Sequence, residues 1–534
     1  MTINIFQRRR AVAELSTQKG HQTLNQIAQA LDISQTSAWR HQTARQSLAD
    51  TPVSDFWSSA AGMTYLIRVV VAVFYCFGIK HGVGAESLGE FFRMIELERH
   101  LATSPSALRT FKARLIESIG QYGNEQLATL DGPKDKEIIV GGDETFFDLP
   151  ILVFMELASG YIFFEIAKAT RSFESWREEC NGIELPEGWR IRGMVSDGAK
   201  ALVKLAVDHL QCVHLPDVFH VLRDLSKPWV SALGRERSRL ERAAKDLAKR
   251  KDKRRSAKHQ AAYDAQVQHH QEQCESLAKA QNDYQQAINA ITTALHPFNH
   301  NTGEWQLWTD WEAQLHEPLK QLQGLAKRLN LSKGETEIET FRAHLPSIAQ
   351  GLSLWWQSVV DALAQTSQDP QMQAWVVSAL LPSVYWHQQA QKTRTLSIKT
   401  IYREAAQQAD NTLKTHPLST QLTPEVYQDW LRWAHQQCTR FQRTSSAIEG
   451  RNGQLSRLYQ ATRGLSPELL NALTIIHNFD TRRADGSTPA ERLFEQSFPC
   501  LFESLVEQIT ELPLPRKSEK SQKPQLLPIL DFPA

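Results

Sequence analysis

EIIVGGDETFFDLPILVFMELASGYIFFEIA, residues 137–167, contains three apolar runs separated by short breaks. The runs Glu137–Phe147, Leu149–Leu157 and Tyr161–Ala167 are rich in β-branched and aromatic residues, which favour strands. Ala158-Ser159-Gly160, between the second and third runs, is typical of a hairpin turn. The stretch therefore predicts three consecutive strands, with Asp143 near the end of the first.

The pattern after this hairpin adds two more strands and two helices. A helical stretch at Phe173–Cys180 is followed by an apolar strand at Ile191–Val195, which leads to Asp197. An amphipathic helix follows, and Gln211–Leu215 reads as a fifth short strand. The order β-β-β-α-β-α-β describes an α/β ribonuclease-H-like core with a mixed five-stranded sheet. Because the first and fourth strands are neighbours in that layout, we expect Asp143 and Asp197 to face each other.

A third acid, Glu449, lies in the polar helical stretch SSAIEGRNGQL. Residues 431–463 hold six Arg, and Glu449 is the one acid among them. Asn452 and Ser456 follow it by three and seven residues, so all three share one helix face. Carboxylates at strand ends are costly to bury unless paired. Together with Glu449, Asp143 and Asp197 are suited to holding two divalent cations of the kind used to attack phosphodiesters.

Four blocks in this order resemble those of DDE transposases from bacterial insertion sequences. They are Asp143-Glu144 after a strand, the SDGA block at 196–199, the PDVFHV block at 216–221, and SSAIEGRNGQLSRLYQATRGLS at 445–466. The resemblance covers roughly residues 137–230 and 430–495. It implies that Asp143, Asp197 and Glu449 bind two Mg²⁺ ions, for which Mn²⁺ substitutes. It also implies cleavage at the ends of a mobile element, transfer of the freed 3′-hydroxyl into target DNA, and a homodimer or larger assembly on double-stranded DNA.

The residues around the three acids divide into candidate helpers and rivals. Alternation along the strand turns Glu144 away from Asp143, so Glu144 is expected to be structural; Asp148 is the other rival for the first acid. His220 either contacts the scissile phosphate or is a structural histidine. The other positions that we expect to support the site or to contact phosphate are Arg451 and Asn452, and those that we expect to contact DNA are Arg457 and Arg463. The spacing of Cys212, His214 and His220 fits no usual zinc ligand set.

The N-terminal region predicts a DNA-binding motif. Residues 22–46 contain two short helical patterns separated by Asp32-Ile33-Ser34, and Ser34 is suited to cap the second helix. This is the pattern of a helix-turn-helix, whose second helix enters the major groove. Its candidate DNA contacts are Gln35, Thr36 and Arg40. Residues 87–114 are either a second, weaker copy or a plain helical bundle.

About 250 residues separate Asp197 from Glu449, far more than the core needs. Gly234–Leu295 predicts a long helical hairpin or short coiled coil with the stripe Leu277, Tyr284, Ile288, Ile291 and Leu295. Residues 235–258 hold twelve Lys or Arg against four acids, so this part either lies along DNA or is simply solvated. The Trp-rich sequence that follows, with Trp305, Trp308 and Trp311, is expected to be core; the alternative is that one of these aromatic rings stacks on a flipped base.

These patterns predict five parts: 1–130, helical and DNA-binding; 131–232, the first part of the core; 233–429, an all-helical insertion; 430–500, the final core helices; and 501–534, a partly flexible tail. The net charge of +1 hides the local basic patches, and six scattered cysteines without a CxxC pair favour a reducing compartment. Arg68 interrupts the apolar stretch Met63–Phe77, which we expect to be a buried helix, not a membrane span. We therefore expect a cytoplasmic, nucleoid-associated bacterial protein. An inactive DNA-binding regulator of the same fold and a nuclease without strand transfer remain the alternatives.

Overall fold

The computed structural model describes residues 11–12, 15, 23–47, 59–130, 132–133, 135–250 and 256–515. These residues form two compact units. The first takes in residues 1–129, 456–482 and 497–534, and the second takes in 130–455 and 483–496. This division differs from the expected one, because residues 456–482 belong with the N-terminal part of the chain.

The start of the first unit holds the two helices expected of the DNA-binding motif, α2 (Leu24–Ala30) and α3 (Gln35–Ser47). Thr23 and Gln26 form a reciprocal capping box at the start of α2. The Ser34 hydroxyl accepts a hydrogen bond from Ser37 N at 3.1 Å, which confirms Ser34 as the cap of α3. Ile27, Ala28 and Ala38 are buried between the helices.

The rest of the first unit is helical. Its elements are α5 (Ala60–Val73), the π-helix η1 (Phe74–Ile79), α6 (Ala85–Met94), the 3₁₀ turn η2 (Leu97–Arg99), α7 (Pro105–Leu127), α20 (Pro467–Asp480) and α22 (Leu501–Gln508). A β-carbon at Gly123 of α7 would lie 2.5 Å from Ile475 Cδ1, so α20 approaches α7 closely. Residues 87–114 span α6 and the start of α7, which is much longer than a typical recognition helix.

The apolar stretch Ala60–Ile79 is long and apolar enough to cross a membrane, but half of it is buried inside the structure. Arg68, in its middle, donates to both carboxylate oxygens of Glu503 on α22, at 2.7 and 2.5 Å. Burial and pairing of this kind favour a core helix, as expected. Residues 516–534 of the predicted tail lie outside the described residues, whereas 501–508 are helical.

The second unit is built on a mixed five-stranded sheet. The strands are β1 (Glu137–Phe146), β2 (Pro150–Glu156), β3 (Ile162–Ala167), β4 (Arg190–Ser196) and β5 (Val213–Pro216), in the order β3-β2-β1-β4-β5. β2 is antiparallel to β1 and β3, whereas β4 is parallel to β1 and β5. The expected five strands and the neighbouring positions of the first and fourth are confirmed.

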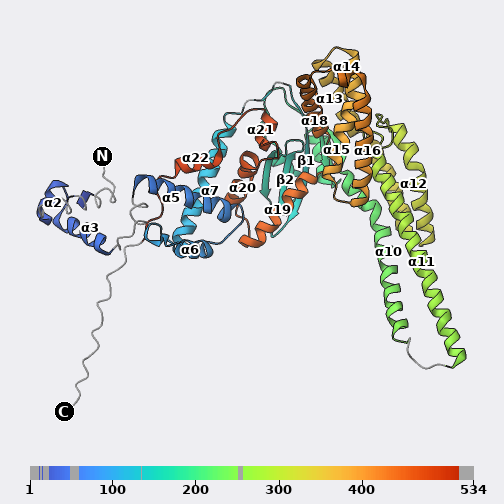
Figure 1. Cartoon of the computed structure of the whole chain (residues 1–534), viewed down its shortest axis with the longest axis horizontal. Helices are drawn as coiled ribbons and strands as arrows, with labels where there is room; N and C mark the ends of the chain where they lie inside the picture. Colours follow the sequence, from blue (N-terminus) through green and yellow to red (C-terminus); the bar gives the residue numbers. More distant parts are fainter. Residues whose placement is uncertain are drawn as a thin grey trace. The chain divides into compact units, whose positions relative to one another are not determined.

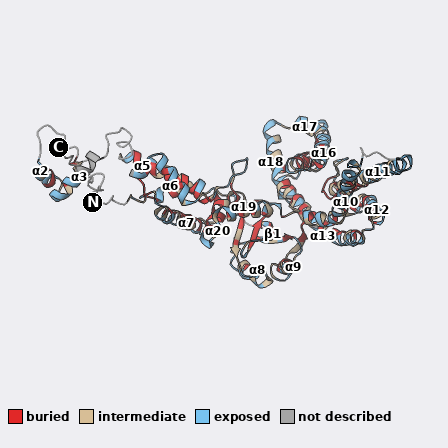
Figure 2. Ribbon diagram, turned by 90° about the horizontal axis from the view of Figure 1, so that it is seen from below, coloured by how far each residue is buried: buried red, intermediate tan, exposed pale blue. Residues whose placement is uncertain are grey.

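Helices cover both faces of this sheet, as Figure 2 shows by placing α8 (Phe173–Cys180) and α9 (Lys200–Lys204) on one side and α19 (Ser446–Thr462) on the other. Two adjacent glycines of β1 let the layers come close. A β-carbon at Gly142 would lie 2.6 Å from Met194 Cε and within contact of Trp176 on α8. One at Gly141 would lie 2.8 Å from Ile448 Cδ1 on α19.

The expected insertion is helical throughout its described regular elements (Figure 1). They are α10 (Val218–Ala248), α11 (Ala257–Ala294), α12 (Trp308–Arg328), α13 (Ser332–Thr366), α14 (Pro370–Trp375), the π-helix η4 (Val376–Leu380), α15 (Leu381–Lys392), α16 (Leu396–Thr415), α17 (Pro417–Gln421) and α18 (Pro424–Arg440). After α9, the chain continues as the π-helix η3 (Leu205–His209), and α21 (Pro489–Phe494) completes the unit.

The predicted hairpin is confirmed, because α10 and α11 lie side by side along much of their length (Figure 1). Ile291 and Leu295 of its stripe are buried, and the other three pack against the same core. On α10, Arg237, Arg239 and Lys249 pair with acids three or four residues away, so part of its basic charge is neutralised locally. The Trp-rich region is core, as expected: Trp311 is buried, and Trp305 stacks on Trp356 with 3.8 Å between ring centroids.

Candidate active site

Asp143 lies near the carboxyl end of β1, partly buried. Its Oδ1 accepts a hydrogen bond from the backbone N–H of Glu144 at 2.9 Å. Burial raises the pKa of Asp143 to about 6, with this N–H opposing the shift and the negative charges of Glu144 and Asp197 adding to it. A carboxylate held with a raised pKa among other acids is a candidate functional group.

Asp197 follows the last residue of the parallel neighbour β4 and is exposed. Its Oδ1 accepts from Ala199 N at 2.9 Å, and Gly198 takes φ of +86° to make that tight turn. Register places the two acids together, since Gly141 pairs with Val195, and Asp143 and Asp197 each come two residues later. The effect of the Asp197 charge on the pKa of Asp143 agrees with this placement.

Glu144 faces the opposite side of the sheet from Asp143, as expected from alternation along β1. Its side chain is 4% exposed and its carboxylate lies 4.0 Å from Arg171, which is itself largely exposed. Burial raises the pKa of Glu144, and the Asp197 charge adds to the shift. Asp148, the other rival, is exposed in the turn after β1.

Helix α19 packs closely against β1 at Gly141, and this brings its polar residues to Asp143. Asn452 Nδ2 donates to Asp143 Oδ2 at 3.0 Å. Because a carboxylate accepts and does not donate when ionised, this contact fixes which end of the amide faces Asp143. Asn452 Oδ1 is then buried without a hydrogen-bond partner among the described residues. The sequence had placed Asn452 on the face of Glu449, and the fold places that face over the first acid.

Glu449 is one helical turn before Asn452 and is about one-third exposed. His220, in the first turn of α10, lies with its Nε2 3.8 Å from Glu449 Oε1. The imidazole is mostly buried, and its Nδ1 lies 3.3 Å from Asp217 Oδ2. His220 therefore reaches the third acid from the insertion side, at a distance longer than a hydrogen bond.

Arg451 was expected to support the site or to contact phosphate, and it is buried, not exposed on the surface of α19. Its guanidinium donates to both oxygens of Glu165 on β3, at 2.8 and 2.6 Å, and both side chains are at most 2% exposed. A bidentate pair of this kind consumes the donors that would have bound phosphate. Arg451 fastens α19 to the sheet.

The predicted DNA contacts have the exposure they need. Gln35, Thr36 and Arg40 are all exposed on α3, and Arg457 and Arg463 are exposed after the core part of α19. These five residues belong to the first unit, whereas the three acids belong to the second.

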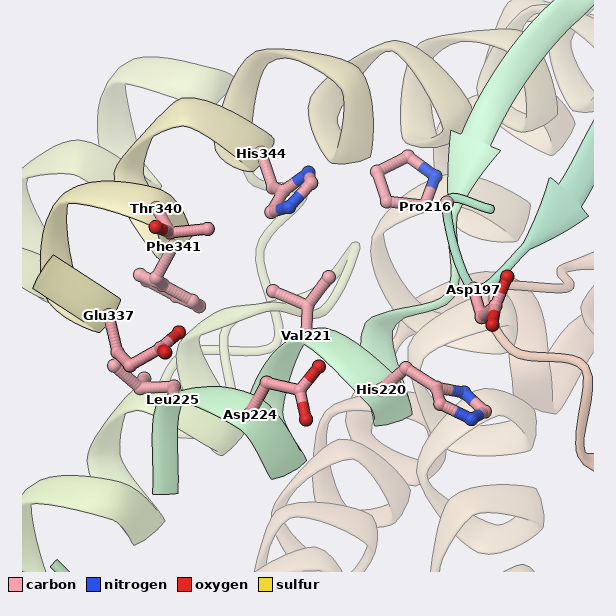
Figure 3. A pocket seen from close by; sticks show the side chains of 11 residues that line it. Asp197, Pro216, His220, Val221, Asp224, Leu225, Glu337, Thr340, Phe341 and His344 are labelled. Atoms are coloured by element: carbon pink, nitrogen blue, oxygen red, sulfur yellow. The ribbon is translucent and has the colours of Figure 1, made fainter. Parts of the chain in front are cut away.

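A pocket of about 80 Å³ opens beside Asp197 (Figure 3). Asp197 and His220 lie on one side of it, and Glu337, Phe341 and His344 of α13 lie on the other. Its volume is enough for a few water molecules. Within the described part of the chain, no three His, Cys, Asp or Glu side chains are close enough together to hold a metal ion as they stand.

Asp217 is the residue that sequence reasoning missed. It is fully buried, and its carboxylate caps α10 by accepting from Phe219 N and His220 N. Its position just before a helical pattern in the PDVFHV block was the available signal, because Asp is a favoured N-cap.

The pH dependence of stability follows from the raised pKa of Asp143. Between about pH 4, the pKa of Asp in an unfolded chain, and pH 6, the folded protein binds a proton here that the unfolded chain does not. The metal-free protein should therefore gain free energy of unfolding from this group as the pH falls through about 6, with the gain complete below about 4. Urea unfolding of wild type and Asp143→Asn across this range measures the difference. Identical pH profiles would show that Asp143 titrates with an ordinary pKa.

Comparison with known proteins adds one match. Residues 376–521 match a family of unknown function, DUF6399. No curated protein and no solved structure matches the chain. The matched stretch contains Glu449 and Asn452, whereas Asp143 and Asp197 precede it.

Proposed function

We propose that this protein is a DDE transposase that cuts DNA at the ends of an insertion sequence and joins the freed 3′-hydroxyl to target DNA. The observation that carries the proposal is the convergence of Asp143, Asp197 and the helix of Glu449. The parallel register of β1 and β4 places Asp143 and Asp197 together at the carboxyl ends of these strands. The hydrogen bond from Asn452 connects α19 to Asp143. The partial burial of Asp143 beside a second acid is costly unless something compensates its charge.

The sheet supports a ribonuclease-H-like assignment for the core. In the order β3-β2-β1-β4-β5, β2 is antiparallel and β4 is parallel to β1, and β1 and β4 are neighbours, as expected for that core. Both proposed strand acids stand at the carboxyl side of parallel neighbours, where α/β sheets commonly bind ligands.

The donors at this edge fit hard divalent cations. Asp143, Asp197 and Glu449 would supply carboxylate oxygens, and the buried Asn452 Oδ1 is an amide oxygen without another partner among the described residues. Two Mg²⁺ ions, or Mn²⁺ in their place, would supply activation of a water and stabilisation of the leaving oxygen. They would also offset the repulsion between the Asp143 and Asp197 charges.

The chain's own groups prepare this chemistry. The N–H of Glu144 and the amide of Asn452 each hold one oxygen of Asp143, so its carboxylate is oriented before substrate arrives. His220 stands beside Glu449, where a protonated imidazole would attract a phosphate. Positioning and charge carry phosphoryl transfer, and no covalent protein intermediate is required.

DNA recognition is proposed for α3, and Arg40 offers the sharpest test of it. Replacing Arg40 with Ala should weaken binding to the element's ends by ~1–3 kcal/mol if Arg40 contacts a base, with a smaller loss on unrelated duplex. Fluorescence anisotropy with both duplexes at one fixed salt concentration measures this difference. Gln29→Ala, an exposed change on the preceding helix, is the matched control. Equal loss on both duplexes would assign Arg40 to phosphate contact, and no loss on either would exclude it.

A second candidate is a DNA-binding regulator of the same fold without catalytic activity. It would bind DNA through the same exposed α3 residues, without metal-dependent nicking. A nuclease that cuts without joining is a variant of the first proposal.

One experiment separates these functions. The purified protein is incubated with labelled duplex carrying the DNA that flanks its gene, with Mg²⁺, Mn²⁺ or EDTA, and with a supercoiled target plasmid. Metal-dependent nicking at the element boundary together with joined product supports the transposase. Nicking without joining supports the nuclease, and tight binding without nicking supports the regulator. Because both ends must be processed together, a dimer or larger assembly is expected on the DNA.

A further inference from the structure

Asp217 joins three parts of the chain that surround the proposed site. Its backbone N–H donates to Ser196 O, one residue before Asp197, at 2.9 Å. Its Oδ1 accepts from Phe219 N at 2.7 Å and from His220 N at 3.3 Å. Its Oδ2 accepts from the backbone N–H of Ser445 at 2.8 Å and from the Ser445 hydroxyl. We call Ser196, Asp217 and Ser445 the Asp217 junction.

The junction leads directly to Glu449. Ser445 precedes α19, and its carbonyl oxygen accepts from Ile448 N at 2.8 Å and from Glu449 N at 3.1 Å. The first turn of α19 is therefore hydrogen-bonded to Ser445. Both donors of Ser445, its backbone N–H and its hydroxyl, are in turn bound by Asp217. On the other side, Asp217 is bonded to the end of β4 that carries Asp197. Asp217 thus contacts both segments, through its backbone N–H on the Asp197 side and through its carboxylate on the Glu449 side.

The turn before Ser445 is also fixed from the helical insertion. The carbonyl oxygen of Arg443 accepts from Val218 N at 3.0 Å. The Arg443 guanidinium donates to Leu295 O and, at 2.9 Å, to His296 Nε2. His296 is completely buried. A guanidinium only donates, so Nε2 accepts, and the proton of the neutral imidazole is on Nδ1, which donates to Tyr385 OH at 2.5 Å.

These contacts hold the Asp217 side chain in one position. A fully buried carboxyl group that accepts hydrogen bonds from four donors is fixed in place, because moving it would leave buried polar groups without a partner. A shift of about 1 Å in a reacting group can cost roughly a hundredfold in rate. The junction is therefore suited to set where Glu449 stands relative to Asp197.

We infer that Asp217 is a positioning residue, which fixes Glu449 against Asp197 through Ser445 and does not itself touch substrate. The inference rests on the proposed function for its effect on rate, but its structural part stands apart from it. The helical insertion then helps to position the site. Asp217 is the N-cap of α10, and Arg443 contacts Leu295 at the end of α11 and the next residue, His296.

The test is a double-mutant cycle with Asp217→Asn and Ser445→Ala. An Asn amide presents one oxygen and one nitrogen, so either Ser445 or the first N–H groups of α10 lose an acceptor, while the backbone bond to Ser196 is kept. We expect Asp217→Asn to slow single-turnover nicking by about tenfold to a hundredfold and Ser445→Ala by about threefold to tenfold, with binding of the ends unchanged. The double variant should be no slower than Asp217→Asn, because both changes break one interaction. Thr444→Ala is the matched control, since that hydroxyl donates to Ser446 Oγ outside the junction.

Amide hydrogen exchange without metal or DNA provides a second readout. Peptides covering 445–455 should exchange faster in Asp217→Asn and Ser445→Ala than in wild type or Thr444→Ala, while α16 exchanges as before. If Asp217→Asn does not fold, Ser445→Ala carries both measurements. Additive rate losses, or unchanged exchange at the start of α19, would overturn the inference. A wild type that binds ends but never nicks would remove the proposed function, and faster exchange would still establish the junction.

Discussion

Asp197→Asn is expected to abolish metal-dependent nicking while leaving binding to the element's ends intact. The loss should be at least about a thousandfold in single-turnover rate, or ~4 kcal/mol of transition-state stabilisation. The change removes one negative charge and one hard oxygen ligand but almost no volume, and Asp197 is exposed at the end of β4, so the fold should persist. Asp143→Asn and Glu449→Gln should have losses of the same order.

Asp208→Asn is the control, since this acid is also exposed and lies in η3 of the same unit. It should nick at the wild-type rate. Retained nicking in Asp143→Asn would assign the first acid to Glu144 or Asp148 instead. Retained nicking in all three acid variants would exclude the proposed site, whatever the wild type does to DNA. End binding, measured in parallel by anisotropy in EDTA, separates loss of chemistry from loss of substrate.

Arg451→Met should be the most destabilising single change at α19. Removing one partner of a buried ion pair leaves the other charge without compensation, at a cost of roughly 3–5 kcal/mol. Glu165 is 0% exposed and accepts two hydrogen bonds from Arg451, so it is the charge that would be left behind. The midpoint of urea unfolding, followed by Trp fluorescence, measures the loss.

Two variants show that the loss comes from the stranded charge. Arg451→Met combined with Glu165→Leu should recover most of the stability, because a buried pair replaced by apolar groups is often close to neutral. Arg432→Met breaks an ion pair in which the side chains of Arg432 and Asp429 are 75% and 66% exposed. It should lower the free energy of unfolding by less than about 1 kcal/mol. An Arg451→Met protein as stable as Arg432→Met would mean that Arg451 does not fasten α19 to β3.

The sequence indicated most of the second unit because its signals are local. Apolar runs and the turn at Ala158-Ser159-Gly160 gave the strands, and parallel neighbours then placed Asp143 beside Asp197. The predicted helix Phe173–Cys180 is confirmed residue for residue as α8. Ser34 was identified as a cap because capping depends on residues within one turn. The hairpin stripe that ends at Leu295 was readable from heptad spacing.

Other features could not be read in this way. Residues 456–482 pack with the first unit, although α19 runs through that boundary without a break in its helical pattern. Arg451 is one of the six Arg in residues 431–463, and only its position over β3 distinguishes it from the exposed Arg457. Asn452 was placed on the correct helix face, but its bond to Asp143 depends on Gly141 allowing α19 to approach β1.

The sequence by itself indicated the five strands, the neighbouring positions of the first and fourth, and the three acids that we propose as the site, because periodicity, turn chemistry and motif spacing act over a few residues. The tertiary structure alone decided which charges are buried and which pairs meet. Asp217 meets Ser445, 228 residues later, and Arg451 meets Glu165, 286 residues earlier. Such pairs form because a buried charge must find donors or acceptors wherever the fold supplies them, and separation along the chain does not specify where that will be.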